Sequence, residues 1–207
     1  MDARRSIRLI VKQSGERTEF HYYNGSEETA VEVMESNRLV FKQGIIPDGT
    51  VVEYYPNDIV KRMFRYRNQK PEGKSVTYYP TGEVWEEQYF KNGQLEGVCA
   101  MYRKDGTLWC ESSYTGGKLH GPCKSYHENG QIEMLSHYAN GKLHGLYEYN
   151  DRFGCLREKG SFRNGVKDGV YTTYEESGEV VSMEIFQNGR MVHTRRRDTS
   201  GMSVGEW

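Results

Sequence analysis

Histidines are the first residues of this sequence whose type and spacing could support chemistry. His120 and His144 each stand in a Lys-Leu-His-Gly segment, and the two are 24 residues apart. Such a pair could bind a metal or relay a proton. However, repeats built from two strands are about 10 Å apart, too far for the bonds of about 2.0–2.1 Å that one metal makes to histidine nitrogens. We therefore interpret both as duplicated turn residues and predict no metal site. His127 and His137 are further candidates without an identifiable partner.

The four cysteines, at positions 99, 110, 123 and 155, have neither metal-ligand spacing nor a dense disulfide pattern. Cys99 and Cys123 are also 24 residues apart, so the same repeat spacing exceeds the limit of about 7 Å between the Cα atoms of a disulfide. We expect small, partly buried thiols. A redox pair that involves Cys110 remains the alternative.

Four glutamates could in principle supply the two carboxylates of a glycoside hydrolase: Glu86, Glu87, Glu111 and Glu158. Nothing in the sequence places two of them at the separation that this reaction needs, and alternate charges in a strand are typical of a solvated sheet face. The sequence also lacks a P-loop, a nucleophile elbow and a zinc signature. We predict a protein that is not an enzyme, with no catalytic residues and no cofactor.

The charge balance limits the classes of partner. The 207 residues include 28 Lys and Arg against 29 Asp and Glu, a net charge of −1, which argues against nucleic acid. Arg195–Arg197 could bind phosphate or lipid headgroups, but we interpret them as part of a solubilising tail. There is no apolar run long enough for a membrane span and no apolar signal segment at the start. Together with the cysteine pattern, this predicts a cytoplasmic protein.

The elements that position these residues repeat with a period of 24. Three columns of glycine are aligned without a gap, and they account for sixteen of the 23 glycines. Counted from the first column, the second lies nine residues on, with Asp58 in the first interval, and the third lies twenty residues on, with Gln69 there. The first column is Gly49, Gly73, Gly97, Gly121, Gly145 and Gly169. A fixed period of this length is the signature of a repeat array.

Within each period the residues predict a β-hairpin. Offset five is tyrosine in every repeat except one, which has Asn150, and offset eleven is Val, Leu or Ile. A three-residue turn that ends in glycine would join two strands and pair offset five with offset eleven, an aromatic–aliphatic pair worth about 0.2–1 kcal/mol. A second turn, such as Lys91-Asn92-Gly93, leads into the next repeat. The prediction is an all-β protein, an elongated antiparallel meander of repeated β-hairpins.

The two ends depart from the period. We divide the chain into a degenerate N-terminal repeat or cap over residues 1–43, the repeat array over 44–193, and a polar, mobile tail over 194–207. Within the first segment, Val31–Val33 and Leu39–Phe41 flank Ser36-Asn37 and predict a hairpin. A short helix over 27–35 is the alternative. Because Asp58, Gln69 and Asn150 break their columns, we expect local distortion in the first and fifth repeats.

This pattern resembles the MORN-repeat variant found in bacterial repeat proteins. The clearest copy runs from Gly121 through Tyr126, Gly130 and Ile132 to Gly145, and Ile46–Asn57 also looks like the family's opening. The resemblance covers residues 44–193 well and implies an array of hairpins. It also implies a protein-interaction scaffold or adaptor. Proteins of this kind are often labelled as antitoxins, and phospholipid binding has been proposed for some MORN repeats.

The tyrosine column admits two interpretations. It packs neighbouring repeats together, or it lines a groove for a partner segment, because aromatic residues are enriched at interfaces. The candidate binding residues are Tyr78, Tyr102 and Tyr126. The leading hypothesis is a non-enzymatic scaffold for a protein partner. The alternatives are an antitoxin that neutralises a cognate toxin and, with weaker support, an adaptor at a membrane surface.

Overall fold

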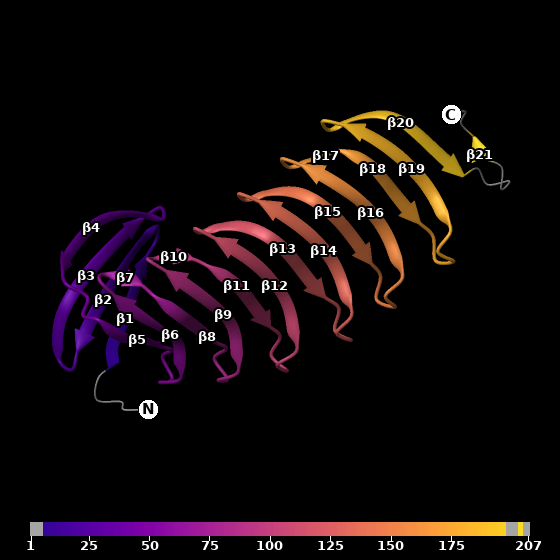
Figure 1. Ribbon diagram of the computed structural model, residues 1–207. Coiled ribbons are helices and arrows are strands. Elements are labelled where there is room, and N and C mark those ends of the chain that lie inside the picture. The colour runs from indigo at the N-terminus through magenta and orange to yellow at the C-terminus, as the bar shows by residue number, and fades with distance from the viewer. Residues whose placement is uncertain (1–5, 198–202, 205–207) are drawn as a thin grey trace. The chain divides into compact units, whose positions relative to one another are not determined.

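Every regular element that the structure describes is a β-strand. The computed structural model describes residues 6–197 and 203–204 (Figure 1). They fall into two compact units: the first runs up to Gly97 and includes Tyr102–Gly106, and the second comprises Val98–Met101 and continues from Thr107. The predicted all-β meander of hairpins is therefore confirmed.

The first unit contains ten strands, and β11 is divided between the two units. The bounds are β1 (Ser6–Ser14), β2 (Arg17–Asn24), β3 (Glu27–Glu35), β4 (Arg38–Gly44), β5 (Gly49–Tyr54), β6 (Val60–Arg67), β7 (Lys70–Pro71), β8 (Gly73–Tyr78), β9 (Val84–Lys91), β10 (Gln94–Leu95) and β11 (Gly97–Tyr102).

The second unit contains the remaining ten. Their bounds are β12 (Leu108–Thr115), β13 (Lys118–Tyr126), β14 (Ile132–Ala139), β15 (Lys142–Asn150), β16 (Leu156–Arg163), β17 (Val166–Lys167), β18 (Gly169–Tyr174), β19 (Val180–Gln187), β20 (Arg190–Arg197) and β21 (Ser203–Val204).

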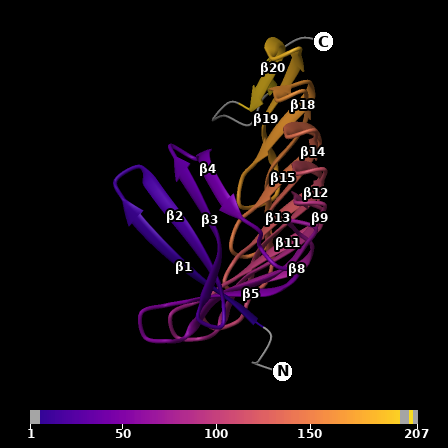
Figure 2. The ribbon, with the colours of Figure 1, turned by 90° about the vertical axis from the view of Figure 1, so that its left-hand side faces the viewer.

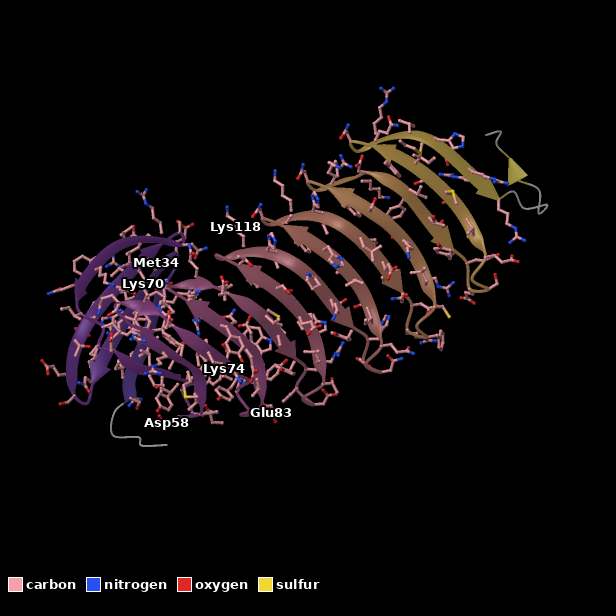
Figure 3. The ribbon with its side chains drawn as sticks, viewed as in Figure 1. Met34, Asp58, Lys70, Lys74, Glu83 and Lys118 are labelled. Carbon is pink, nitrogen blue, oxygen red and sulfur yellow. The ribbon has the colours of Figure 1, made fainter. Side chains whose placement is uncertain are left out.

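The first turn of each repeat has the predicted geometry. The N–H of the turn glycine donates to the carbonyl three residues earlier, as in Gly82 to Tyr79 at 2.9 Å, and the glycine has a positive φ. Offset five pairs with offset eleven, for example Tyr78 with Val84 and Tyr126 with Ile132. Figure 3 shows Asp58 and Glu83, both near first turns, at one edge of the first unit and Lys70, next to a second turn, at the opposite edge.

A β-bulge follows this pair and was not predicted. In the first repeat Tyr54 pairs with Val60 but Glu53 pairs with Arg62, so Lys61 is an extra residue on the second strand. The same shift occurs between β8 and β9, β13 and β14, β15 and β16, and β18 and β19. A bulge increases the local twist of the pair.

The second turn is a two-residue turn with positive φ at both positions. Asn92 and Gly93 have φ values of 53° and 84°, and the other repeats are similar. Positive φ at both central residues defines the type I′ turn, which favours Asn-Gly. The turn glycine also donates its N–H to the preceding repeat, as Gly93 does to the Pro71 carbonyl at 2.9 Å, so this edge links neighbouring repeats.

The expected distortion at the broken columns is wrong. Asp58 and Gln69 adopt φ values of 59° and 62°, the left-handed conformation that glycine has in the other repeats. Asn150 pairs with Leu156 in the usual register. The backbone of the repeat therefore tolerates these substitutions.

The N-terminal strands form two successive hairpins. β1 pairs with β2, β2 with β3 and β3 with β4, all antiparallel. The hairpin predicted around Ser36-Asn37 is confirmed, and the alternative helix over 27–35 is wrong because those residues form β3. A departure from a purely antiparallel meander is the parallel pair of β1 with β5, in which Ser6 lies opposite Thr50. Figure 2 shows β1–β4 inclined to β5, β8 and β9.

This arrangement buries the main hydrophobic core. Its fully or nearly fully buried members are Ile7, Leu9, Tyr22, Ala30, Ile46, Val51, Phe64 and Tyr66. They come from β1, β2, β3, β5, β6 and the segment that follows β4. The first strands therefore pack on the first repeat as well as extending it.

The second unit is a single row of antiparallel strands (Figure 1). Its last repeat ends in β20, which pairs with β19 through Arg196. Thr194–Arg197, the start of the expected mobile tail, are thus part of a strand. The rest of that tail lies outside the described residues, except Ser203–Val204.

Candidate functional site

Four aromatic rings lie in contact on one face of the second unit. Tyr147 begins this row, with its ring centroid 5.7 Å from Phe162 and 6.2 Å from Tyr171, on which it stacks. Tyr171 is 6.5 Å from Phe186, edge to face. Centroid distances of 4.5–7 Å are those of attractive aromatic pairs. We call this surface the ring face and define it by these four residues.

Glycines make room for the ring face. The aromatic residues at offset seventeen lie opposite the first glycine column, for example Phe162 opposite Gly145 and Phe186 opposite Gly169. Gly160 serves Tyr171 in a different way, because a Cβ at this position would lie 2.2 Å from the Tyr171 ring atom Cδ2. The ring of Tyr171 therefore rests on bare backbone.

Polar groups fix the orientation of Tyr171. Its hydroxyl donates to Glu158 Oε2 at 2.5 Å, and Lys167 Nζ lies 3.4 Å from its ring centroid. Burial, followed by the neighbouring carboxylate of Glu158, raises the pKa of Tyr171 above its ordinary value. Lys167, which breaks the leucine column at offset twenty-two, is thus a cation–π partner. Tyr147, Phe162 and Phe186 remain half-exposed beside it.

The predicted binding tyrosines belong to a different surface. Tyr78, Tyr102 and Tyr126 are the last residues of β8, β11 and β13, and all three are half-buried. Because side chains alternate along a strand, Tyr126 lies on the face opposite Cys123 and the ring face of its unit. Its hydroxyl donates to Glu111 at 2.9 Å, and burial followed by this carboxylate raises its pKa. Their role in binding stays a prediction.

The family is decided by the periodic hairpins. The model of the MORN repeat variant matches residues 47–68, 71–92, 119–140 and 167–188, segments whose starts keep the 24-residue period. The chain is a MORN-repeat protein. A comparison with curated proteins found no match.

The MORN hairpin also extends to repeats that the family model does not match. β15 and β16 fall within one of the unmatched intervals, yet Asn150 pairs with Leu156 and the turn glycine Gly154 donates to Asp151 as in the matched repeats. The structure describes no helix long and apolar enough to cross a membrane.

The histidines occupy strands in this MORN array. His120 and His144 are exposed residues of β13 and β15, so their interpretation as turn residues is wrong. They precede a glycine of the first column, where other repeats have Asp48, Glu72 or Asp168. Those acids accept a hydrogen bond from the next second turn, such as Asn92 N–H to Glu72 at 2.7 Å. Among the described residues, no group of three or more His, Cys, Asp or Glu could hold a metal ion.

The cysteines differ in exposure. Cys99 is buried, Cys110 and Cys123 are half-buried, and Cys155 is exposed. Cys123 Sγ lies 3.1 Å from Ser112 Oγ, its neighbour across the strand pair. Partial burial therefore describes three of the four thiols.

The candidate glutamates are bound to neighbouring side chains. Glu87 forms an ion pair with Lys74 at 2.7 Å, Glu111 with Lys124 at 2.8 Å, and Glu158 accepts the Tyr171 hydroxyl. Glu86 accepts a hydrogen bond from Gln88. The Lys124 hydrogen bond lowers the pKa of Glu111. These contacts stabilise cross-strand pairs.

Two of the three C-terminal arginines have acidic partners in the structure. Arg196 lies 3.5 Å from Glu184, and Arg197 lies 2.9 Å from Glu175 and also contacts Glu179. These contacts reduce the charge available for a phosphate or a lipid headgroup.

Sequence reasoning missed two sets of residues. Tyr147 and Tyr171 share offset two, a position that faces the same side as offset seventeen, so the aromatic column at seventeen could have revealed them. Offset six was also missed. Its side chains reach the next repeat: Tyr55 donates to the Tyr78 carbonyl at 2.7 Å and Tyr79 to the Tyr102 carbonyl at 2.9 Å.

Proposed function

We propose that this MORN-repeat protein is a non-enzymatic scaffold that binds a protein partner on the ring face. The observation that carries the proposal is the contiguous row of Tyr147, Phe162, Tyr171 and Phe186 on one side of a single layer of strands. Large, rigid aromatic side chains supply contact area at a low cost in conformational entropy. They are also the residues most often found to dominate binding energy at protein interfaces.

The absence of catalysis is part of this proposal. The candidate glutamates are engaged in cross-strand pairs, and MORN repeats are typically not catalytic. A toxin is one class of protein partner that the family resemblance suggests. The engaged arginines at the end of β20 favour a protein partner over a membrane surface.

Affinity capture from the native host, followed by mass spectrometry, tests the proposal. We expect the wild-type chain to enrich a defined protein and a Tyr147→Ala/Phe162→Ala variant to lose it. The matched control is Tyr126→Ala/Tyr174→Ala, which removes two rings from the opposite face of the same unit. Circular dichroism and thermal melting would establish that each variant is folded.

The outcome separates the two faces. Loss of the partner with the ring-face variant alone supports the proposal. Retention by the ring-face variant and loss with the control would instead place binding on the predicted tyrosine column. Equal retention by both folded variants would contradict a role for either face.

A further inference from the structure

Strand β4 is an edge strand with an unusual surface. It pairs with β3 on one side, and the ladders of the described residues place no strand on its other side (Figure 2). All seven of its residues are exposed. Its outer row of backbone N–H and C=O groups is therefore available to another strand.

The side chains of this edge are apolar. Leu39, Val40 and Phe41 are 48–49% exposed, and Ile45, directly after the strand, is 70% exposed. Protein edge strands are usually short, covered or strongly charged, because a long apolar edge promotes pairing with other chains. A run of exposed apolar residues on an open edge is what β-strand addition uses: main-chain hydrogen bonds provide affinity and alternate side chains provide specificity.

The charges of β4 select the occupant. Arg38 and Lys42 flank the apolar run, and the strand contains no acidic residue. Like charges opposite each other on paired strands are destabilising, whereas opposite charges are favourable. The register shift at Leu39 and Val40 adds a bulge, another device that discourages unselective pairing.

A second copy of this chain fits the edge poorly. Pairing of β4 with another β4 would bring Arg38 and Lys42 close to the same residues of the copy. The other terminal repeat strand, β20, is also basic, with Arg190 and Arg195–Arg197. A pair of seven-residue strands would also bury much less than the roughly 1,200 Å² of a stable interface.

We infer that β4 binds an extended, acidic segment of a partner protein by strand addition, with Glu or Asp opposite Arg38 and Lys42 and apolar residues opposite Leu39 and Phe41. This surface belongs to the first unit and the ring face to the second. The inference therefore does not depend on the proposed function.

Titration with model peptides tests this inference. The probe is a capped eight-residue peptide of alternating Glu and Val, compared with a Lys-Val peptide and with a Glu-Val peptide methylated on alternate backbone nitrogens. We expect the first peptide alone to bind and to slow amide hydrogen exchange in Arg38–Gly44. The methylated peptide should fail because it cannot complete the ladder.

Charge reversal provides the matched test. Arg38→Glu/Lys42→Glu should weaken the Glu-Val peptide about tenfold at low salt and reverse the preference toward the Lys-Val peptide, since two exposed charge pairs are involved. The control Lys91→Glu/Lys104→Glu makes the same change in charge within the first unit but outside β4, and should leave binding unchanged. The variant Tyr147→Ala/Phe162→Ala should also bind the peptide normally.

Three results would overturn the inference. The first is no binding of the Glu-Val peptide to folded protein, and the second is protection of amides outside β4. The third is a concentration-dependent dimer whose β4 amides are already protected without peptide, which would identify a second copy as the occupant.

Discussion

Two residues that replace glycine show how the same backbone conformation can be reached for different reasons. Asp58 and Gln69 both have φ near +60°. The side chain of Asp58 is 88% exposed and lies 3.8 Å from Arg8, a distant surface pair. Gln69 instead binds both the N–H and the C=O of the fully buried Ile46, at 3.1 and 2.5 Å. Identical substitutions at the two positions should therefore have opposite effects.

Asp58→Gly should stabilise the first unit. Glycine adopts positive φ without the steric cost that other residues incur, and we expect a gain of about 0.5–1 kcal/mol in the free energy of unfolding. Urea unfolding measures it. The control Gly106→Asp, in an open turn of the same type, should destabilise by a similar amount. Destabilisation by Asp58→Gly would show that its contact with Arg8 matters more than the backbone.

Gln69→Gly should destabilise the protein although it completes the glycine column. The change leaves two buried backbone groups of Ile46 without partners, at a cost of about 1–3 kcal/mol for each such group, which exceeds the conformational gain. The same urea measurement applies. An increase in stability would mean that water or another side chain replaces the lost amide.

At the scale of the element, side chains at offset six connect successive hairpins. Tyr79→Phe removes the hydroxyl that donates to the Tyr102 carbonyl, and we expect a loss of about 0.5–1.5 kcal/mol in the free energy of unfolding. The matched control is Tyr89→Phe in β9, an exposed ring with no hydrogen bond among those of its hydroxyl in the structure. Equal effects of the two changes would argue against the link between repeats.

The ring face depends on the absence of a side chain at Gly160. We expect Gly160→Ala to displace Tyr171, weaken its bond to Glu158 and destabilise the second unit by about 1–3 kcal/mol, because the added methyl group overpacks the site. The control is Ser136→Ala, at the same offset one repeat earlier. Thermal melting measures stability, and the chemical shifts of the Tyr171 ring report displacement; unchanged shifts would contradict the prediction.

The sequence predicted the hairpins well because glycine and aromatic columns repeat six times. It did not predict the bulge, because a single extra residue such as Lys61 leaves the period unchanged. Tyr147 and Tyr171 escaped notice because offset two is occupied by Val51, Ser75 and two cysteines in the earlier repeats. Their environment depends on strand pairing, which brings offset two beside offset seventeen.

At the scale of the whole molecule, the two units are stabilised in different ways. The first unit contains the cluster of Ile7, Leu9, Ile46, Val51 and their neighbours. In the second unit, among the described residues, the buried hydrophobic side chains are those of Cys99 and Tyr171. Apolar burial is the main favourable contribution to folding. The first strands thus supply a core that the regular repeats lack, and a long-range contact of this kind could not be read from a local pattern.

Hydrogen exchange should reveal this difference. Amides of β1, β2, β5 and β6 should exchange on the order of tenfold more slowly than those of β14 to β16, because opening them exposes the core. Mass spectrometry of peptides from exchanged protein measures this under native conditions. Uniform protection across both units would show that the strand ladders, and not the core, determine stability.

The parallel pair of β1 with β5 has a consequence for synthesis of the chain. Ser6 finds its partner, Thr50, roughly forty residues later, whereas each hairpin pairs residues that are close in sequence. Non-local pairs form slowly and leave unpaired edges exposed while they wait. As the nascent chain leaves the ribosome, the first two hairpins must therefore remain unfinished until the first repeat has emerged. Later repeats can then join, one after another, a nucleus that is already closed.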